Sequence, residues 1–159
     1  MRALLFVALL APSAVAQPAM PPIDTGSAPA CATLAAVPAD AAIPRPAAFA
    51  RISFASCAAM AKLSALHLKA DDASVEAVAA AAKSSLDLYQ AAIDQNDPAL
   101  TPIAKAAMAD LYTAMAVRLR TAVPPITMMT VGAQLTAHDE AHAFVESKIG
   151  PWLAKGRQP

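Results

Sequence analysis

The segment ASVEAVAAAAKSSLDLYQAAIDQ, residues 73–95, decides the fold class of this 159-residue chain. Its apolar side chains recur at intervals of three or four residues, at Val75, Val78, Ala82, Leu86, Tyr89 and Ile93. This spacing aligns them along one side of an α-helix, whereas a half-buried strand would need apolar and polar residues to alternate. Asp72 or Ser74 is available as the N-cap, and Glu76 lies where the helix dipole favours a negative charge. The sequence therefore predicts an amphipathic helix here.

Three further segments have a similar pattern. They are residues 47–70, a segment that begins at Pro98 or Pro102 and ends near Val123, and residues 130–149. Prolines mark their boundaries, because proline is tolerated in the first turn of a helix and ends it elsewhere. Four amphipathic segments of about 18 to 24 residues with short connections predict an all-α fold, an antiparallel up-down four-helix bundle.

The predicted core is the apolar side of each helix. In the first helix it comprises Phe49, Ile52, Met60 and Leu63. In the third helix it comprises Ala104, Met108, Leu111, Met115 and Leu119. In the fourth helix it comprises Val131, Leu135, His138, His142, Val145 and Ile149. Two histidines therefore interrupt the apolar side of the fourth helix.

Composition agrees with helices and excludes several functions. Hydrophobic residues make up 57% of the chain, charged residues 15% and aromatic residues 4%. Much of the apolar share is alanine, the best helix former, which buries little area and allows close packing. The 12 basic and 12 acidic side chains balance, so no field steers the chain toward nucleic acid, and none is expected as a partner.

The N-terminus has the pattern of an export signal. Met1-Arg2 is followed by an apolar run at residues 3–11, and small residues precede Gln17. The run is too short to cross a bilayer, and no later apolar run reaches that length, so no transmembrane segment is expected after cleavage. We expect residues 1–16 to be removed and the protein to be exported, with periplasm and extracellular medium not distinguished.

Residues 17–46 contain seven prolines, which prevent a long helix or a central strand. We expect an irregular Pro-rich arm there, followed by the helical domain at residues 47–159. Cys31 and Cys57 are the two cysteines, and in an exported chain an even number favours a disulfide. Their bond would tie the arm to the first helix.

One polar motif stands out, His138-Asp139-Glu140-Ala141-His142. Histidines four residues apart share one face of a helix, so His138 and His142 could bind one Cu, Zn or Ni ion, with Glu146 one turn further on as a third ligand. Alternatively, both rings pack in the core without a cofactor, each with a hydrogen bond. Asp139 stands where the zinc-protease motif requires glutamate, which argues against that enzyme class.

No catalytic motif emerges from the sequence. It contains no GxSxG, no SxxK and no glycine-rich phosphate loop. Arg118 and Arg120 could bind an anion or be solvated at a helix end. We expect a non-enzymatic binding or structural protein of the cell envelope, whose partner could be a protein or a small ligand. A periplasmic metal-binding or metal-sensing bundle that uses His138 and His142 is the alternative. The oligomeric state is not predicted.

Overall fold

A computed structural model describes Cys31 and residues 45–126 and 131–157. This part of the chain forms four helices and no strand: α1 (Arg45–Ala65), α2 (Asp72–Asp94), α3 (Leu100–Arg120) and α4 (Ala133–Gly156). The predicted all-α fold is confirmed. The predicted signal peptide and all of the predicted arm except residues 31, 45 and 46 lie outside the described residues.

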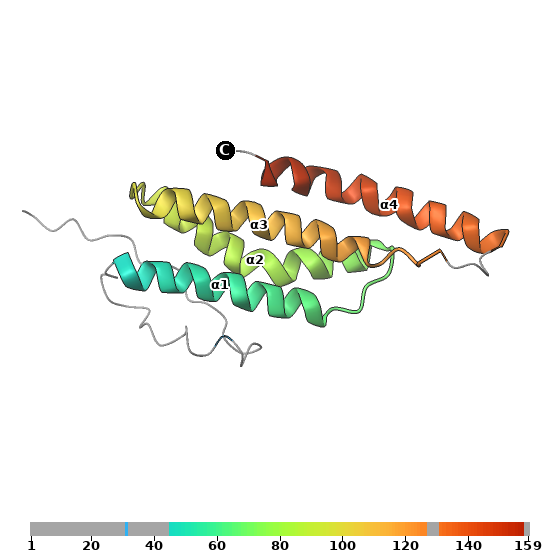
Figure 1. The fold of residues 1–159 in the computed structure, drawn as a ribbon, viewed down its shortest axis with the longest axis horizontal. Helices are drawn as coiled ribbons and strands as arrows, with labels where there is room; N and C mark the ends of the chain where they lie inside the picture. Colours follow the sequence, from blue (N-terminus) through green and yellow to red (C-terminus); the bar gives the residue numbers. More distant parts are fainter. Residues whose placement is uncertain (1–30, 32–44, 127–130, 158–159) are drawn as a thin grey trace, which may run out of the picture.

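The four helices are not arranged as a closed bundle. Helices α1, α2 and α3 all pack against one another, and α4 packs mainly against α3. The α1–α2 and α3–α4 connections lie at one end of the molecule and the α2–α3 connection at the other (Figure 1). In a four-helix bundle of the predicted kind, α4 would lie beside α1 and close the ring. Here it leaves the space between α1 and α3 open.

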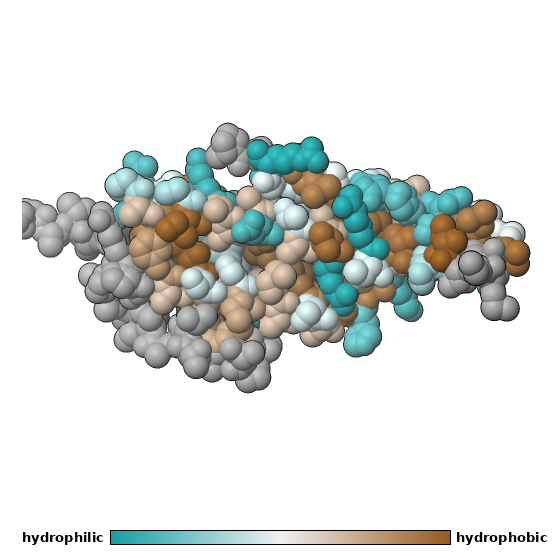
Figure 2. Space-filling model, viewed as in Figure 1, coloured by the Kyte–Doolittle hydropathy of each residue, from teal (hydrophilic) through white to brown (hydrophobic). Residues whose placement is uncertain are grey.

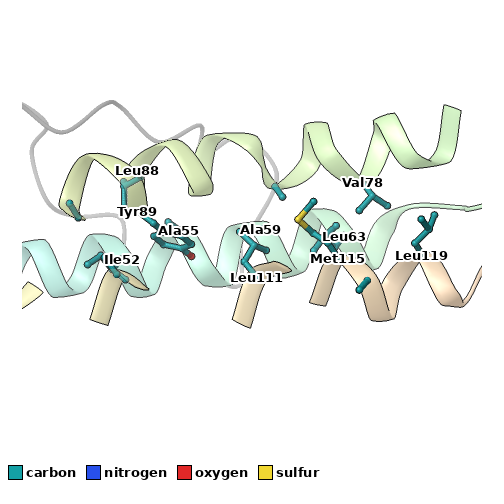
Figure 3. Packing of buried hydrophobic residues seen from close by; sticks show 14 of the residues in the cluster. Ile52, Ala55, Ala59, Leu63, Val78, Leu88, Tyr89, Leu111, Met115 and Leu119 are labelled. Carbon is teal, nitrogen blue, oxygen red and sulfur yellow. The ribbon is translucent and has the colours of Figure 1, made fainter. Parts of the chain in front are cut away.

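Most of the core lies between the first three helices (Figure 3), and Val145 and Ile149 of α4 belong to the same cluster. Tyr89, Leu88, Leu63, Met115 and Leu119 are among its largest fully buried side chains. Leu88 lies off the predicted seam of α2 and is still completely buried, because α2 contacts both α1 and α3 and buries a wide arc. The Ser85 hydroxyl donates to the Ala55 carbonyl oxygen at 2.8 Å and so joins α2 to α1 inside this core.

The ends of α1 and α2 differ from the predicted ones. Helix α1 ends at Ala65, five residues early, and the chain then crosses to α2. Asp71 is the N-cap of α2, instead of Asp72 or Ser74. Its carboxylate accepts the backbone N–H of Ser74 at 2.8 Å, and the Ser74 hydroxyl in turn accepts the backbone N–H of Lys69 at 2.9 Å. These two bonds fix the turn that directs the chain into α2.

Helix α4 starts later and ends later than predicted. It begins after Gly132 and continues through Gly150 and Pro151 to Gly156. Proline removes one backbone donor from the helix. The helix continues because Trp152, directly after the proline, packs against the core, and Gly156 lies close against α3. A Cβ at Gly156 would lie 3.1 Å from the Ala109 carbonyl oxygen, a tight contact, so this close approach favours glycine.

The first half of α4 projects beyond the ends of the other helices (Figure 1). Along its predicted core stripe, Val145 and Ile149 are fully buried, whereas Val131 is 74% and Leu135 45% exposed. The prediction that the whole stripe lies in the core is therefore wrong for its first half. Amphipathic spacing identifies the apolar side of a helix, but it does not tell how far the neighbouring helix extends alongside it.

Cys31 and Cys57 form the predicted disulfide, with their Cα atoms 6.0 Å apart. Cys31 is buried and packs with Phe54 and Ala58 in a second, smaller apolar cluster on α1. The bond therefore attaches a segment before the helices to the side of α1.

Candidate functional site

The open space between α1 and α3 is an apolar groove with a volume of about 500 Å³. Its wall and floor are formed by Ile52, Ser53, Ser56 and Met60 of α1, Tyr89 of α2, and Ile103, Ala106, Ala107, Asp110, Leu111 and Ala114 of α3. Most of these residues are small or apolar, which lets another molecule approach the helix backbones closely. In the view of Figure 2 the surface over α1 and α3 is mostly pale to brown, with isolated hydrophilic side chains.

Two large apolar side chains at the groove are exposed to solvent. Met60 is 52% exposed and Ile103 39%. The sequence places Met60 in the core, which the structure contradicts, because the neighbour that would cover it in a closed bundle is absent. Val117, seven residues after Asp110 and so on the same side of α3, is 55% exposed. The apolar surface therefore continues along α3 beyond the groove.

Polar groups in the groove are few and fixed. The hydroxyls of Tyr89 and Ser56 lie 2.6 Å apart, and Ser56 also donates to the Ile52 carbonyl oxygen at 3.1 Å. Because Ser56 uses its proton there, Tyr89 donates to Ser56. Burial raises the pKa of Tyr89, so its phenol stays neutral. Asp110 is exposed and contributes a carboxylate to the groove.

Arg118 binds the C-terminal end of α1. Its guanidinium donates to the carbonyl oxygens of Leu63 at 2.7 Å, Ser64 at 3.2 Å, and Leu66. The last carbonyls of a helix lack intrahelical donors and carry partial negative charge, so a cation is favoured there. The arginine belongs to α3 and caps α1. It is neither an anion site nor a freely solvated side chain, the two interpretations that the sequence allowed.

Arg120 pairs with Glu146 and joins α3 to α4. Its guanidinium donates to the two carboxylate oxygens of Glu146 at 2.8 and 3.1 Å. The hydrogen bonds from Arg120 hold the pKa of Glu146 below its usual range, with smaller contributions from the charges of Arg120 and His142. Glu146 could bind a metal ion only by giving up this ion pair.

His138 and His142 lie on the projecting half of α4. Their rings stack with centroids 6.3 Å apart. His138 is half-buried, and its Nδ1 lies 2.7 Å from the Pro124 carbonyl oxygen in the α3–α4 connection. His142 is exposed. The alternative prediction, that both rings pack in the core, is wrong because this part of α4 has no helix beside it.

The hydrogen bond from His138 fixes its tautomer. A carbonyl oxygen only accepts, so Nδ1 carries the proton and Nε2 carries the lone pair. Metal-binding histidines commonly have this arrangement, with the second ring nitrogen donating to a backbone carbonyl. Among the described residues, no group of three or more His, Cys, Asp and Glu side chains is placed to hold a metal ion together. The structure therefore brings His138 and His142 together, without a third ligand.

Met108, Met115 and Asp110 of α3 could each supply a further metal ligand by their chemistry, but none of them lies beside the histidines. Met108 and Met115 belong to the core cluster on α3, and Asp110 lies at the α1–α3 groove. The groove itself was missed by sequence reasoning. The signal that could have found it is the run of small residues on α3 at Ala106, Ala107 and Ala114, but a closed bundle predicts the same run.

None of the described helices is both long and apolar enough to cross a lipid bilayer. No protein-family model, characterised protein or solved structure matches this chain. The function is therefore argued from the groove and the projecting helix alone.

Proposed function

We propose that this chain is an exported helical-bundle protein of the cell envelope with a binding rather than a catalytic role, and that the α1–α3 groove is its binding surface. The exposure of Met60 and Ile103 at the mouth of an apolar groove carries this proposal. Large apolar side chains gathered around a concave surface mark binding sites more often than scattered ones do. The polar side chains at the surface of the groove, Ser53, Ser56 and Asp110, would fix the orientation of the bound partner.

The partner that fits this groove is an amphipathic helical segment. The groove lies between two helices, and a helix can fill such a space with side chains at positions i, i+3, i+4 and i+7. Ala106 and Ala107 permit a close approach, and Asp110 can accept hydrogen bonds or pair with a cation. A small ligand in the same groove is the other outcome of the test below.

The envelope location is supported by two features. The Cys31–Cys57 disulfide is typical of oxidising compartments, and the first 16 residues have the pattern of an export signal. The proposal includes the antiparallel up-down order of the helices, which the positions of the three connections support. The proposal keeps the irregular Pro-rich arm predicted at residues 17–46, except for Arg45 and Pro46, which belong to α1.

Site-specific photo-crosslinking in cells tests the groove. A photoreactive amino acid is placed at Met60 or Ile103, and at the exposed Ala143 of α4 as the control. We expect the groove positions to form a covalent adduct with a second polypeptide, identified by mass spectrometry, and the control position to form none. If neither groove position forms an adduct with a polypeptide or a small ligand, or if Ala143 forms the same one, the groove is not the binding surface.

A second candidate function is metal binding through His138 and His142. The observation that favours it is the hydrogen bond from His138 to Pro124, which leaves Nε2 ready to bind a metal beside the ring of His142. Imidazole nitrogen is a good ligand for Zn, Cu and Ni. This site would take one ion with two protein ligands, completed by water.

Titration with Cu, Zn and Ni salts tests this site. A bound ion stabilises the folded state in proportion to the logarithm of its concentration over its dissociation constant, about 2.7 kcal/mol at a hundredfold excess over Kd. We expect at least one ion to raise the Tm. The variant His138→Ala/His142→Ala should lose the shift. The control variant His67→Ala, at the exposed histidine in the α1–α2 connection, should keep it. An equal shift in the double variant would place the bound ion elsewhere.

A further inference from the structure

The chain has two uncovered apolar surfaces, the α1–α3 groove and one side of the projecting half of α4. The α1–α3 groove is open where a fourth helix would complete the bundle. The stripe of α4 that packs on α3 at Val145 and Ile149 continues beyond α3 to the exposed Leu135, and the exposed Val131 precedes the helix. Brown, hydrophobic residues are visible on both regions in the single view of Figure 2. Both surfaces are apolar and exposed to solvent, so each could be covered by the other.

The two surfaces also agree in length. Residues 133–144, the helical part of the projecting half, span about 17 Å at 1.5 Å per helical residue. The exposed side of α3 from Ile103 to Val117 spans about 21 Å by the same measure. The projecting segment would therefore cover most of the length of the groove.

Polar groups on the two surfaces are complementary. The groove has a carboxylate, Asp110, among apolar and small residues. The stripe of α4 has two imidazoles, His138 and His142, among apolar residues. The exposed His142 can donate an imidazole N–H to a carboxylate. The N–H of His138 is already used by the Pro124 carbonyl oxygen. No cationic side chain lines the groove among the described residues, so Asp110 does not meet a competing partner there.

We propose that the projecting half of α4 docks in the α1–α3 groove of a second copy of this chain, and that the second copy does the same in return. The inference rests on the proposed function and names the partner of the groove. The resulting contact is isologous, so every residue pair occurs twice and the two contacts reinforce each other. The α1–α3 groove of each copy is then covered by α4 of the partner.

The test measures the mass of the exported full chain in solution as a function of concentration. We expect a dimer for the natural sequence. Ala106→Glu in the groove and Leu135→Glu on the projecting helix each place a charge in the docked contact, and should raise the dimer Kd at least about 100-fold. Both residues are exposed in the single chain, so neither change should disturb its fold. Ala143→Glu, an exposed alanine on another side of α4, should dimerise normally.

Mixing the two disruptive variants separates this dimer from any other. Ala106→Glu keeps an intact helix and Leu135→Glu keeps an intact groove, so an equimolar mixture restores one of the two contacts and should form a heterodimer. A natural chain that stays monomeric, or a dimer that neither variant weakens, would overturn the inference. So would a mixture that stays monomeric. A groove adduct with a different protein would then leave the proposed function standing without this partner.

Discussion

Replacing Ile149 with alanine is expected to lower the free energy of unfolding by about 3 kcal/mol, and to release α4 from the other three helices. Ile149 and Val145 are the two buried residues of α4. The substitution removes three carbon atoms from a side chain with no exposed surface, and leaves a cavity against α3. Because α1, α2 and α3 pack on one another without α4, their own core stays intact.

Denaturant unfolding and amide hydrogen exchange measure the two parts of this prediction. The midpoint should fall for Ile149→Ala, and α4 amides should exchange much faster while those around Leu88 in α2 stay protected. Ile149→Val, which removes one methyl group, should cost only about 1 kcal/mol. Uniform loss of protection over all four helices would show instead that α4 is part of one cooperative core.

Removal of the disulfide is expected to cost about 3.5 kcal/mol. The bond closes a loop of 26 residues, and in the chain-entropy model a loop of this length restricts the unfolded chain by that amount. A small domain has only about 5 to 15 kcal/mol of stability, so the loss is a large share of the total. Cys31 is also buried beside Phe54, and releasing it would expose this smaller cluster.

The Cys31→Ser/Cys57→Ser double variant and the natural chain under reducing conditions should both show the lower stability. The natural chain under oxidising conditions is the control. Reducing agent should leave the Tm of the double variant unchanged, because no other cysteine is present in the sequence. Equal stability of oxidised and reduced natural chains would contradict the prediction. Thiols that alkylate without prior reduction in the purified natural chain would show that the bond is not formed.

The helices could be predicted from the sequence because they depend on residues that lie close together along the chain. Spacing of three and four residues, as at Val78, Ala82 and Tyr89, and prolines at the boundaries are visible without knowledge of the fold. The disulfide could be predicted because only one pairing is possible within the chain. The exact helix ends could not, since Asp71 and Asp72 are both suitable caps and the turn at Ser74 decides between them.

The relative position of the helices could not be predicted, and the candidate site depends on it. Met60 and Leu63 have the same local pattern, yet Met60 is half exposed at the groove and Leu63 is buried. The difference arises because α4 lies against α3 and leaves α1 uncovered. The same position of α4 leaves His138 half-buried and His142 exposed. Their i, i+4 spacing predicts that the two rings lie together, and they do.

The cap that Arg118 places on α1 has a consequence for the order in which the chain becomes structured. The donor for the carbonyl oxygens of Leu63 and Leu66 is Arg118, which lies more than fifty positions later in the sequence. When a ribosome or a secretion channel delivers the polypeptide from its N-terminal end, Cys31 and Cys57 are free to join well before that donor emerges. The disulfide would then hold the middle of α1 in place while its last turn still frays, until Arg118 emerges and caps it.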